Sequence, residues 1–288
     1  EVARAINAEV KAGRGSPHGG VFLDIASRRS TDYIRRRLPS MYHQFKQLAD
    51  VDITAQPMEV GPTMHYIMGG IRVEADTAAT TVPGLFAAGE CAGGMHGANR
   101  LGGNSLSDLV VFGRRAGLGA AQDAAAQVTG PEADDAQVEE IFAEMRAPFG
   151  REDGEGPYDI QRDLQETMNS LVGIIRTEHE LLQAREQIDA LKQRATNVSV
   201  YGHQQYNPGW HLAMDLQALL TVSEATARAA NIREESRGGH TRDDYPGPND
   251  TDWGTRNVVI SQGVDGAMEV STSPLPEMPA ELKELFEE

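Results

Sequence analysis

The spacing of apolar and polar residues predicts short mixed elements at the start of the chain. A four-residue apolar repeat begins at Val2 and ends near Gly13, which is typical of a helix. The run VFLDI at 21–25 predicts a strand, and residues 30–49 read as helical on both sides of one proline. Residues 1–60 therefore have the pattern of the end of a mixed α/β unit. We expect the chain to be part of a longer protein.

A second zone, residues 61–128, combines short extended segments with repeated glycines. From Gly69 the pattern predicts a strand, a polar hairpin region with a turn at 83–84, and a buried strand over 85–88. A glycine-rich loop follows, and then a helix that starts near Asn104. This layout is typical of anion and cofactor sites, because backbone N–H groups can approach a ligand and the helix start adds partial positive charge.

The predicted helix has candidate caps and a face of small residues. Asn104 and Ser105 are the candidate caps, and Asp108 follows Ser105 at the spacing of a capping box. A face of small side chains permits close packing against a sheet or a nucleotide. Its members are Gly113, Ala116, Gly117 and Ala120.

The rest of the chain predicts helices and then a small hairpin. Residues 129–235 are acidic and show the three- and four-residue apolar spacing of a helical bundle. The apolar positions are Leu171, Ile174, Ile175, Leu181, Leu182, Ile188 and Leu191. Residues 236–288 begin with a polar loop and contain a hairpin pattern around Asp265 and Gly266. We assign no chemistry to the helical zone.

Composition narrows the function classes. The 288 residues include 43 acidic and 26 basic ones, and the formal charge of -17 disfavours nucleic acid and anionic membrane surfaces as direct partners. The single cysteine, Cys91, excludes an internal disulfide and cannot alone hold an iron–sulfur cluster or a zinc site. No apolar run reaches the roughly 20 residues of a membrane span. A reducing cytoplasm is the expected compartment.

One arginine, Arg100, lies inside the most glycine-rich stretch, HGANRLGGNSL. A guanidinium can bind a carboxylate through two parallel hydrogen bonds, which lysine cannot reproduce. An isolated arginine is more often a surface or capping residue. The surrounding motif favours a binding role.

Three ordered motifs carry a family resemblance: PTMHYIMGGI, GLFAAGECAGGMHGANRLGGNSLSDLVVFGRRAG and REESRGGHTRDDYP. Together they resemble the flavoprotein subunit of succinate dehydrogenase and fumarate reductase, and the stretches LPSMYHQFKQLADVDIT and PLPEMPAELKELFEE resemble its actinobacterial type. The resemblance implies an α/β plus α fold containing part of a Rossmann-like FAD-binding domain. The implied divisions are the end of a capping domain (1–60), the C-terminal part of the FAD domain (61–128), a helical bundle domain (129–235) and a small C-terminal domain with a hairpin (236–288).

The resemblance implies substrate contacts in two of the motifs. Arg100 corresponds to the arginine that binds a carboxylate of succinate or fumarate, and His65 to a histidine at the same substrate. Gly103 lines the same wall and is a weaker candidate. His96 also lies in the loop, and we expect only packing or hydrogen bonding from it.

The FAD contacts implied by the resemblance lie at the strand end and the helix start. Glu90 corresponds to an acceptor for the ribityl or ribose hydroxyls of FAD. Ser105 and Leu106 correspond to positions whose backbone lies against the isoalloxazine ring, where the helix start would stabilise negative charge on the reduced flavin.

Other family features have no counterpart in the chain. No G-x-G-x-x-G follows a strand, and the arginine that delivers the proton would fall just before Glu1. We therefore expect a fragment without the N-terminal half, inactive alone. In the full-length protein the resemblance implies hydride transfer between the dicarboxylate and FAD. Electrons would pass to an iron–sulfur subunit, and through it to membrane anchor subunits, at the cytoplasmic face of the inner membrane.

Three other interpretations stay open at this point. An L-aspartate oxidase-like flavoenzyme shares the HGANRLxxNSL wall, although LVVFGRRAG favours the dehydrogenase. A flavin-free binding or assembly module is favoured by the expected absence of the N-terminal half of the FAD domain. A plain helical scaffold leaves the loop over 89–106 unexplained.

Overall fold

The computed structural model describes residues 2–127, 130 and 132–286. The chain forms two compact units, one ending at His65 and the other beginning at Tyr66. Each unit is described by itself below.

The first unit contains three helices and a two-stranded sheet. The helices are α1 (Val2–Lys11), α2 (Thr31–Arg37) and α3 (Pro39–Leu48), and the antiparallel strands are β1 (Val21–Leu23) and β2 (Met58–Val60). Pro39 separates the two helices because its ring suits the first turn of α3 but not the interior of a helix. A small core of Ile34, Ile53 and Met58 holds the unit together. The predicted strand and the helices on both sides of Pro39 are confirmed.

In the second unit, single bridges replace regular strands between Tyr66 and Gly103. Ile71 bridges Ala92 in parallel, and Ala79 bridges Phe86 in antiparallel fashion. The prediction of a buried strand over 85–88 is therefore wrong. The segment forms one bridge, and Leu85 is 49 % exposed. A strand requires neighbours for its N–H and C=O groups, and the described residues offer this segment one bridge.

A long helix, α4 (Asn104–Ala126), follows the loop. Its close contact is made by Gly119, where a Cβ atom would lie 2.5 Å from the carbonyl oxygen of Thr77 and 2.9 Å from the Phe86 ring. Gly113 and Gly117, expected on the packing face, have open space beside them. The prediction that a small residue packs closely is right, but the residue is one that the pattern did not select. Pattern alone does not give the rotation of a helix about its axis.

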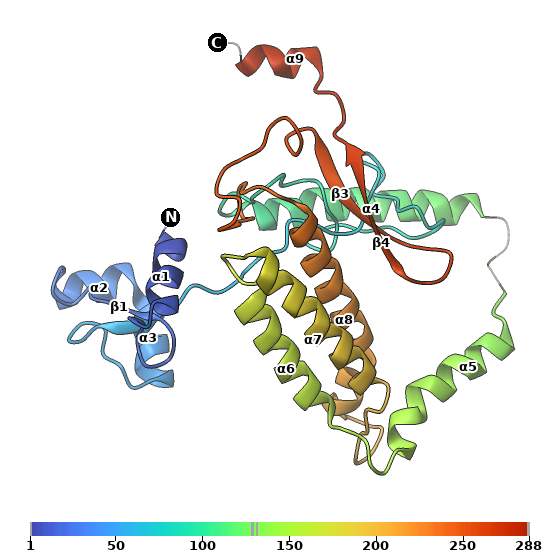
Figure 1. The fold of residues 1–288 in the computed structure, drawn as a ribbon, viewed down its shortest axis with the longest axis horizontal. Coiled ribbons are helices and arrows are strands. Elements are labelled where there is room, and N and C mark those ends of the chain that lie inside the picture. The colour runs from blue at the N-terminus through green and yellow to red at the C-terminus, as the bar shows by residue number, and fades with distance from the viewer. Residues whose placement is uncertain (1, 128–129, 131, 287–288) are drawn as a thin grey trace. The chain divides into compact units, whose positions relative to one another are not determined.

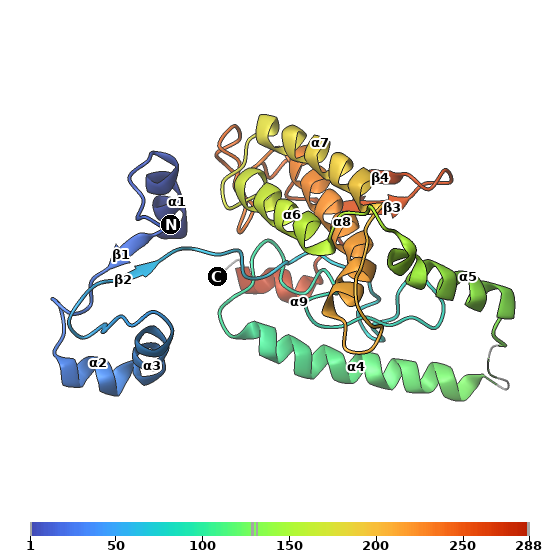
Figure 2. The same ribbon diagram turned by 90° about the horizontal axis from the view of Figure 1, so that it is seen from below.

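Three helices pack side by side in the second unit (Figures 1 and 2). They are α6 (Pro157–Leu171), α7 (Glu178–Ala195) and α8 (Pro208–Ile232). Leu181, Ile188 and Leu220 are fully buried in their shared core. Leu182 is 42 % exposed, so one of the expected apolar positions faces outward. Before them, α5 (Asp135–Arg146) buries none of its residues and leads into a short 3-10 helix, η1 (Ala147–Gly150).

The apolar pattern from 164 to 195 is broken into two helices. After Leu171 the chain leaves the helix, and Ile174 and Ile175 lie in the connection. Thr177 then begins α7 with a capping box, in which its side chain accepts from Glu180 N and the Glu180 carboxylate accepts from Thr177 N. The capping box stabilises a new helix start and explains the break within the continuous apolar pattern.

The chain ends in a hairpin and a short helix. Strands β3 (Arg256–Gln262) and β4 (Met268–Pro274) pair antiparallel, with Gly266 at φ 81° in the turn, as the sequence predicts. A short helix, α9 (Ala280–Lys283), and a 3-10 turn, η2 (Glu284–Phe286), follow. Arg228 of α8 joins the hairpin to the bundle, since it pairs with buried Glu224 and donates to Met268 O.

Candidate functional site

Two glycine-containing segments meet at the centre of the candidate site. Ile71 N donates to Cys91 O at 2.8 Å, and Gly93 N donates to Ile71 O at 3.0 Å. A Cβ atom on Gly70 would lie 2.5 Å from Cys91 O, so only glycine permits this approach. Two of the sequence motifs are thereby held side by side.

The approach places Glu90 beside the first motif. Its Oε1 accepts the N–H of Ile67 at 3.0 Å, and the side chain is otherwise exposed. A carboxylate has further acceptor positions for hydroxyl donors. Glu90 therefore lies on the surface of the site with capacity for a ligand.

Tyr66, His96 and Asp108 form a cluster at the loop, in which Asp108 is buried and the two rings are partly buried. The Tyr66 hydroxyl donates to Asp108 Oδ2 at 3.2 Å, and His96 Nε2 lies 3.3 Å from the same oxygen. The Tyr66 and His96 rings meet edge to face at 5.4 Å. Burial, followed by the charge of Asp108, raises the pKa of Tyr66, so its hydroxyl remains a donor at neutral pH.

Arg100 lies on this cluster. Its guanidinium carbon is 4.6 Å from the centre of the Tyr66 ring, within the range of a cation–π contact. Within the described residues it makes one hydrogen bond, from Nη1 to Leu101 O at 3.1 Å, and no ion pair. Its Nε and Asp108 Oδ1 are buried without hydrogen-bond partners. Since buried polar atoms are seldom left unpaired, this cluster is where we expect a further polar group.

Helix α4 starts at the same loop without a side-chain cap. Gly103 is the N-cap residue, at φ 86°, and no side chain accepts from the first turn. The capping box expected of Ser105 and Asp108 is therefore wrong, because the Asp108 carboxylate is turned toward Tyr66 and His96. Ser105 is half-buried and Leu106 is 71 % exposed. Asn104 N donates to Leu101 O and Leu106 N to Gly103 O, so the helix dipole and the remaining N–H groups of the first turn are what α4 offers to an anion or a flavin ring.

His65 lies outside the unit that carries these residues. It is exposed and is the last residue of the first unit, whereas Glu90, Arg100, Gly103, Ser105 and Leu106 all belong to the second. The other five residues lie in or beside one loop, between the end of the bridge region and the first turn of α4. The expectation that His65 contacts the substrate stays a prediction.

Sequence reasoning missed Tyr66 as a site residue and misread Asp108 as a cap. The available signals were an aromatic residue directly after the motif histidine and an acid on the first turns of a helix. Neither is specific, because such an acid usually interacts with its own helix start. His96, by contrast, has the packing and hydrogen-bonding role expected of it.

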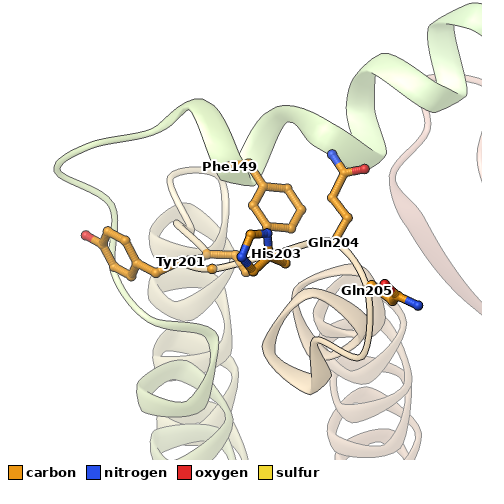
Figure 3. Close-up of a pocket in the computed structure, with 7 residues that line it drawn as sticks. Phe149, Tyr201, His203, Gln204 and Gln205 are labelled. Carbon is orange, nitrogen blue, oxygen red and sulfur yellow. The ribbon is translucent and has the colours of Figure 1, made fainter.

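A hollow elsewhere in the second unit is unrelated to these residues. A pocket of about 650 Å³ is lined by η1 and the loop that joins α7 to α8, with Phe149 and His203 beside each other and Tyr201 pointing outward (Figure 3). None of its lining residues belongs to the predicted site.

Within the part of the chain that the structure describes, no helix is long and apolar enough to cross a membrane. Among the described residues, no group of three or more His, Cys, Asp and Glu side chains is placed so that it could hold a metal ion.

Comparison with known proteins finds family models that match two long stretches of the chain. Residues 1–106 match the FAD binding domain, and residues 161–284 match the C-terminal domain of the fumarate reductase flavoprotein. The chain is 40% identical over 248 residues to a polypeptide of the CoM/CoB fumarate reductase of Methanothermobacter marburgensis, covering 85% of this chain and 44% of that one.

Solved structures agree with this assignment. Sdh1 of Mycobacterium smegmatis, in complex with UQ1, superposes with a TM-score of 0.90 at 56% identity over 99% of this chain and 48% of that one. E. coli quinol fumarate reductase superposes with a TM-score of 0.87 at 31% identity, covering 96% of this chain and 49% of that one. The chain spans about half the length of the curated relatives that it matches. It belongs to the family of succinate dehydrogenase and fumarate reductase flavoprotein subunits.

Proposed function

We propose that this chain supplies one wall of the active site of a flavoprotein that interconverts succinate and fumarate. The observation that carries the proposal is Arg100, a guanidinium stacked on Tyr66 that has no ion pair within the described residues, beside the uncapped start of α4. In a chain with 43 acidic residues, a cation left without a carboxylate partner suits a carboxylate ligand.

The residues present fit FAD on one side of that wall. Glu90 has acceptor capacity for hydroxyl groups, and α4 presents an uncapped first turn at Ser105 and Leu106. Gly102 and Gly103 have no heavy atom within 4 Å of where a Cβ would lie, so a ring could approach the backbone there. FAD supplies hydride transfer chemistry when it is bound.

We assign the binding roles as follows. Arg100 and His65 hold the carboxylates of the dicarboxylate, and Gly103 lines the wall between substrate and flavin. Arg100 orients the substrate through its two parallel donors, and fixing the substrate relative to the flavin removes much of the entropic barrier. The protonated Tyr66 hydroxyl is engaged by Asp108, so Tyr66 serves to hold Arg100 and not to deliver a proton. We assign proton delivery to no residue of this chain.

The proposal extends to architecture and partners. The division into the end of a capping domain (1–60), part of the FAD domain (61–128), a helical domain (129–235) and a C-terminal domain (236–288) is part of it. Electrons leave through an iron–sulfur subunit bound to membrane anchor subunits, at the cytoplasmic face of the inner membrane. The family assignment and the single cysteine of this chain support that separate carrier.

The test is Arg100→Lys in the full-length protein, with Arg114→Lys on the exposed side of α4 as the matched control. Loss of the bidentate fork should lower kcat/KM for succinate and for fumarate roughly 10- to 100-fold, while FAD content stays unchanged. Arg114→Lys should leave kcat/KM and FAD content unchanged. Wild-type turnover in Arg100→Lys would remove Arg100 from the site.

Two measurements on the wild-type full-length protein address the other interpretations. A colourless protein that binds no FAD would indicate a flavin-free module. Oxidation of aspartate by oxygen, without turnover of succinate or fumarate, would indicate the oxidase. We expect bound FAD and turnover of the C4 dicarboxylates.

A further inference from the structure

A turn far along the chain lies against the loop that carries Arg100. Gly239 N donates to Ala98 O at 2.9 Å, and Ala98 precedes Arg100 by two residues. The turn begins just after α8, about 140 residues further along the sequence. The contact joins the third sequence motif, REESRGGHTRDDYP, to the second, HGANRLGGNSL.

The contact requires glycine at one position. Gly238 has φ +59°, and a Cβ atom there would lie 2.3 Å from Ala98 O and 2.8 Å from Ala98 Cβ. The nearest atoms are backbone and Cβ, which cannot move aside as a flexible side chain can. At Gly239 the requirement is weaker, because a Cβ would lie 3.1 Å from the end of the Met68 side chain and 3.6 Å from Ala98 O.

The turn is held by its own backbone hydrogen bonds and by contacts of the His240 ring. Arg237 N donates to His240 O at 2.8 Å, and His240 N donates to Arg237 O at 3.0 Å, which closes the two glycines into a tight turn. The His240 ring lies between Arg176 Nη1, at 3.1 Å from its Nδ1, and Arg233 O, at 3.0 Å from its Nε2. This arrangement suits the neutral ring, with Nδ1 accepting from Arg176 and Nε2–H donating to the carbonyl.

A buried carboxylate fixes the residues that flank the turn. Glu235 is 0 % exposed and pairs with Arg233 at 2.6 Å and with Arg237 at 2.9 Å. Although burial would raise the pKa of Glu235, hydrogen bonds from Arg237 and from Asn249 N hold it at about 2. These contacts tie the residues on both sides of the turn to the surrounding structure.

We propose that the turn formed by Gly238 and Gly239 is a positioning element that holds the Ala98 to Arg100 segment, and through it the guanidinium of Arg100, in the geometry that binds the dicarboxylate. The inference rests on the proposed role of Arg100. A glycine-rich loop has much backbone entropy to lose on binding a ligand, and an external anchor at Ala98 removes part of that cost before the ligand arrives.

The test compares three glycine-to-alanine variants of the full-length, FAD-loaded protein. In Gly238→Ala the dissociation constant for fumarate, followed through the flavin absorbance, should rise about tenfold with unchanged FAD content. Gly239→Ala should change it less than threefold. Gly247→Ala is the matched control, because no atom lies within 4 Å of its Cβ position, and it should match wild type. Faster hydrogen exchange in Gly238→Ala should be confined to peptides covering 96–103 and to the turn at 236–242, because the lost contact joins Ala98 O to Gly239 N.

The outcomes separate the inference from the function on which it rests. If Arg100→Lys weakens fumarate binding and Gly238→Ala does not, the positioning role is wrong and the proposed function stands. If neither variant weakens binding, the proposed function falls. Should Gly238→Ala fail to fold, wild type decides the matter, since saturating fumarate should slow hydrogen exchange at 236–242 by the reciprocity of coupling. Unchanged exchange there would overturn the inference.

Discussion

At the scale of single residues, the cation of Arg100 is held by an aromatic face. Most arginines near the end of α8 are paired with carboxylates, as Arg233 and Arg237 are with Glu235. Arg100 instead stacks on Tyr66, whose hydroxyl is fixed by buried Asp108. An aromatic face orients a guanidinium without neutralising it, so the charge remains available for an anion.

Two substitutions at Tyr66 should separate its ring from its hydroxyl. Tyr66→Phe keeps the face under Arg100 but removes the donor to Asp108. We therefore expect a loss of about 1 kcal/mol in the free energy of unfolding, with fumarate affinity within twofold of wild type. Tyr66→Leu removes the face and should weaken fumarate binding about fivefold. Denaturant unfolding and flavin absorbance titration measure the two effects, and equal affinity in both variants would contradict the role of the ring.

At the scale of elements, the connection before α7 and the turn after α8 are joined through His240. Arg176 comes from the connection, and Arg233 lies directly after α8. Burial lowers the pKa of His240 to about 4, and the charges of Arg176, Arg233 and Arg242 act in the same direction. Between about pH 4 and pH 6.5, the His240 ring is therefore neutral in the folded chain and protonated in the unfolded chain.

The resulting pH dependence has a definite sign. Below pH 6.5 the unfolded chain binds a proton at His240, whereas the folded chain binds one only near pH 4. Stability from this group is therefore complete above pH 6.5 and is lost as the pH falls through that window, by up to about 3 kcal/mol.

Denaturant unfolding of wild type and His240→Gln at pH 7, 5.5 and 4.5 measures this contribution. The stability difference between the two should shrink as the pH falls. The variant serves as the reference for all other titrating groups. A difference independent of pH would show that the ring is not kept neutral.

At the scale of the whole molecule, the chain comprises two units with separate cores. The core of the first unit contains Ile34, and that of the second contains Leu220. The acidic composition of residues 131–155 predicts a solvated stretch, and α5 within it does bury none of its residues. Glu155 differs, because it forms an ion pair with Arg194 of α7. Its carboxylate is part of the bundle.

Neutralising α5 should therefore leave assembly intact. Glu139, Glu140 and Glu144 are exposed on this helix, and changing all three to Gln removes charge without touching Glu155 or the cap at Asp134. We expect the proposed iron–sulfur subunit to co-purify with the full-length variant as it does with wild type, and succinate-driven quinone reduction in membranes to continue. Loss of co-purification would show that this acidic face is the docking surface.

Local signals were sufficient for much of the fold. Pro39 marks the boundary between two helices, and the glycine turn at 266 marks the hairpin, because both act through the backbone of their own neighbourhood. The motif loop and the position of the helix start were likewise visible as a glycine-rich stretch before an apolar repeat, although the caps expected at Asn104 and Ser105 were wrong. The family could be recognised from the same stretches, because it is carried by contiguous residues.

Only the tertiary structure decided which side chains meet. The sequence could not show that Asp108 turns from its own helix start to Tyr66, or that Gly119 and not Gly113 packs against Phe86. It also gave no sign that Gly238 must approach Ala98 from a distant part of the chain. The physical reason is common to all three. Periodicity and capping rules describe contacts within a few residues, whereas these contacts depend on how separate segments pack, which no local pattern encodes.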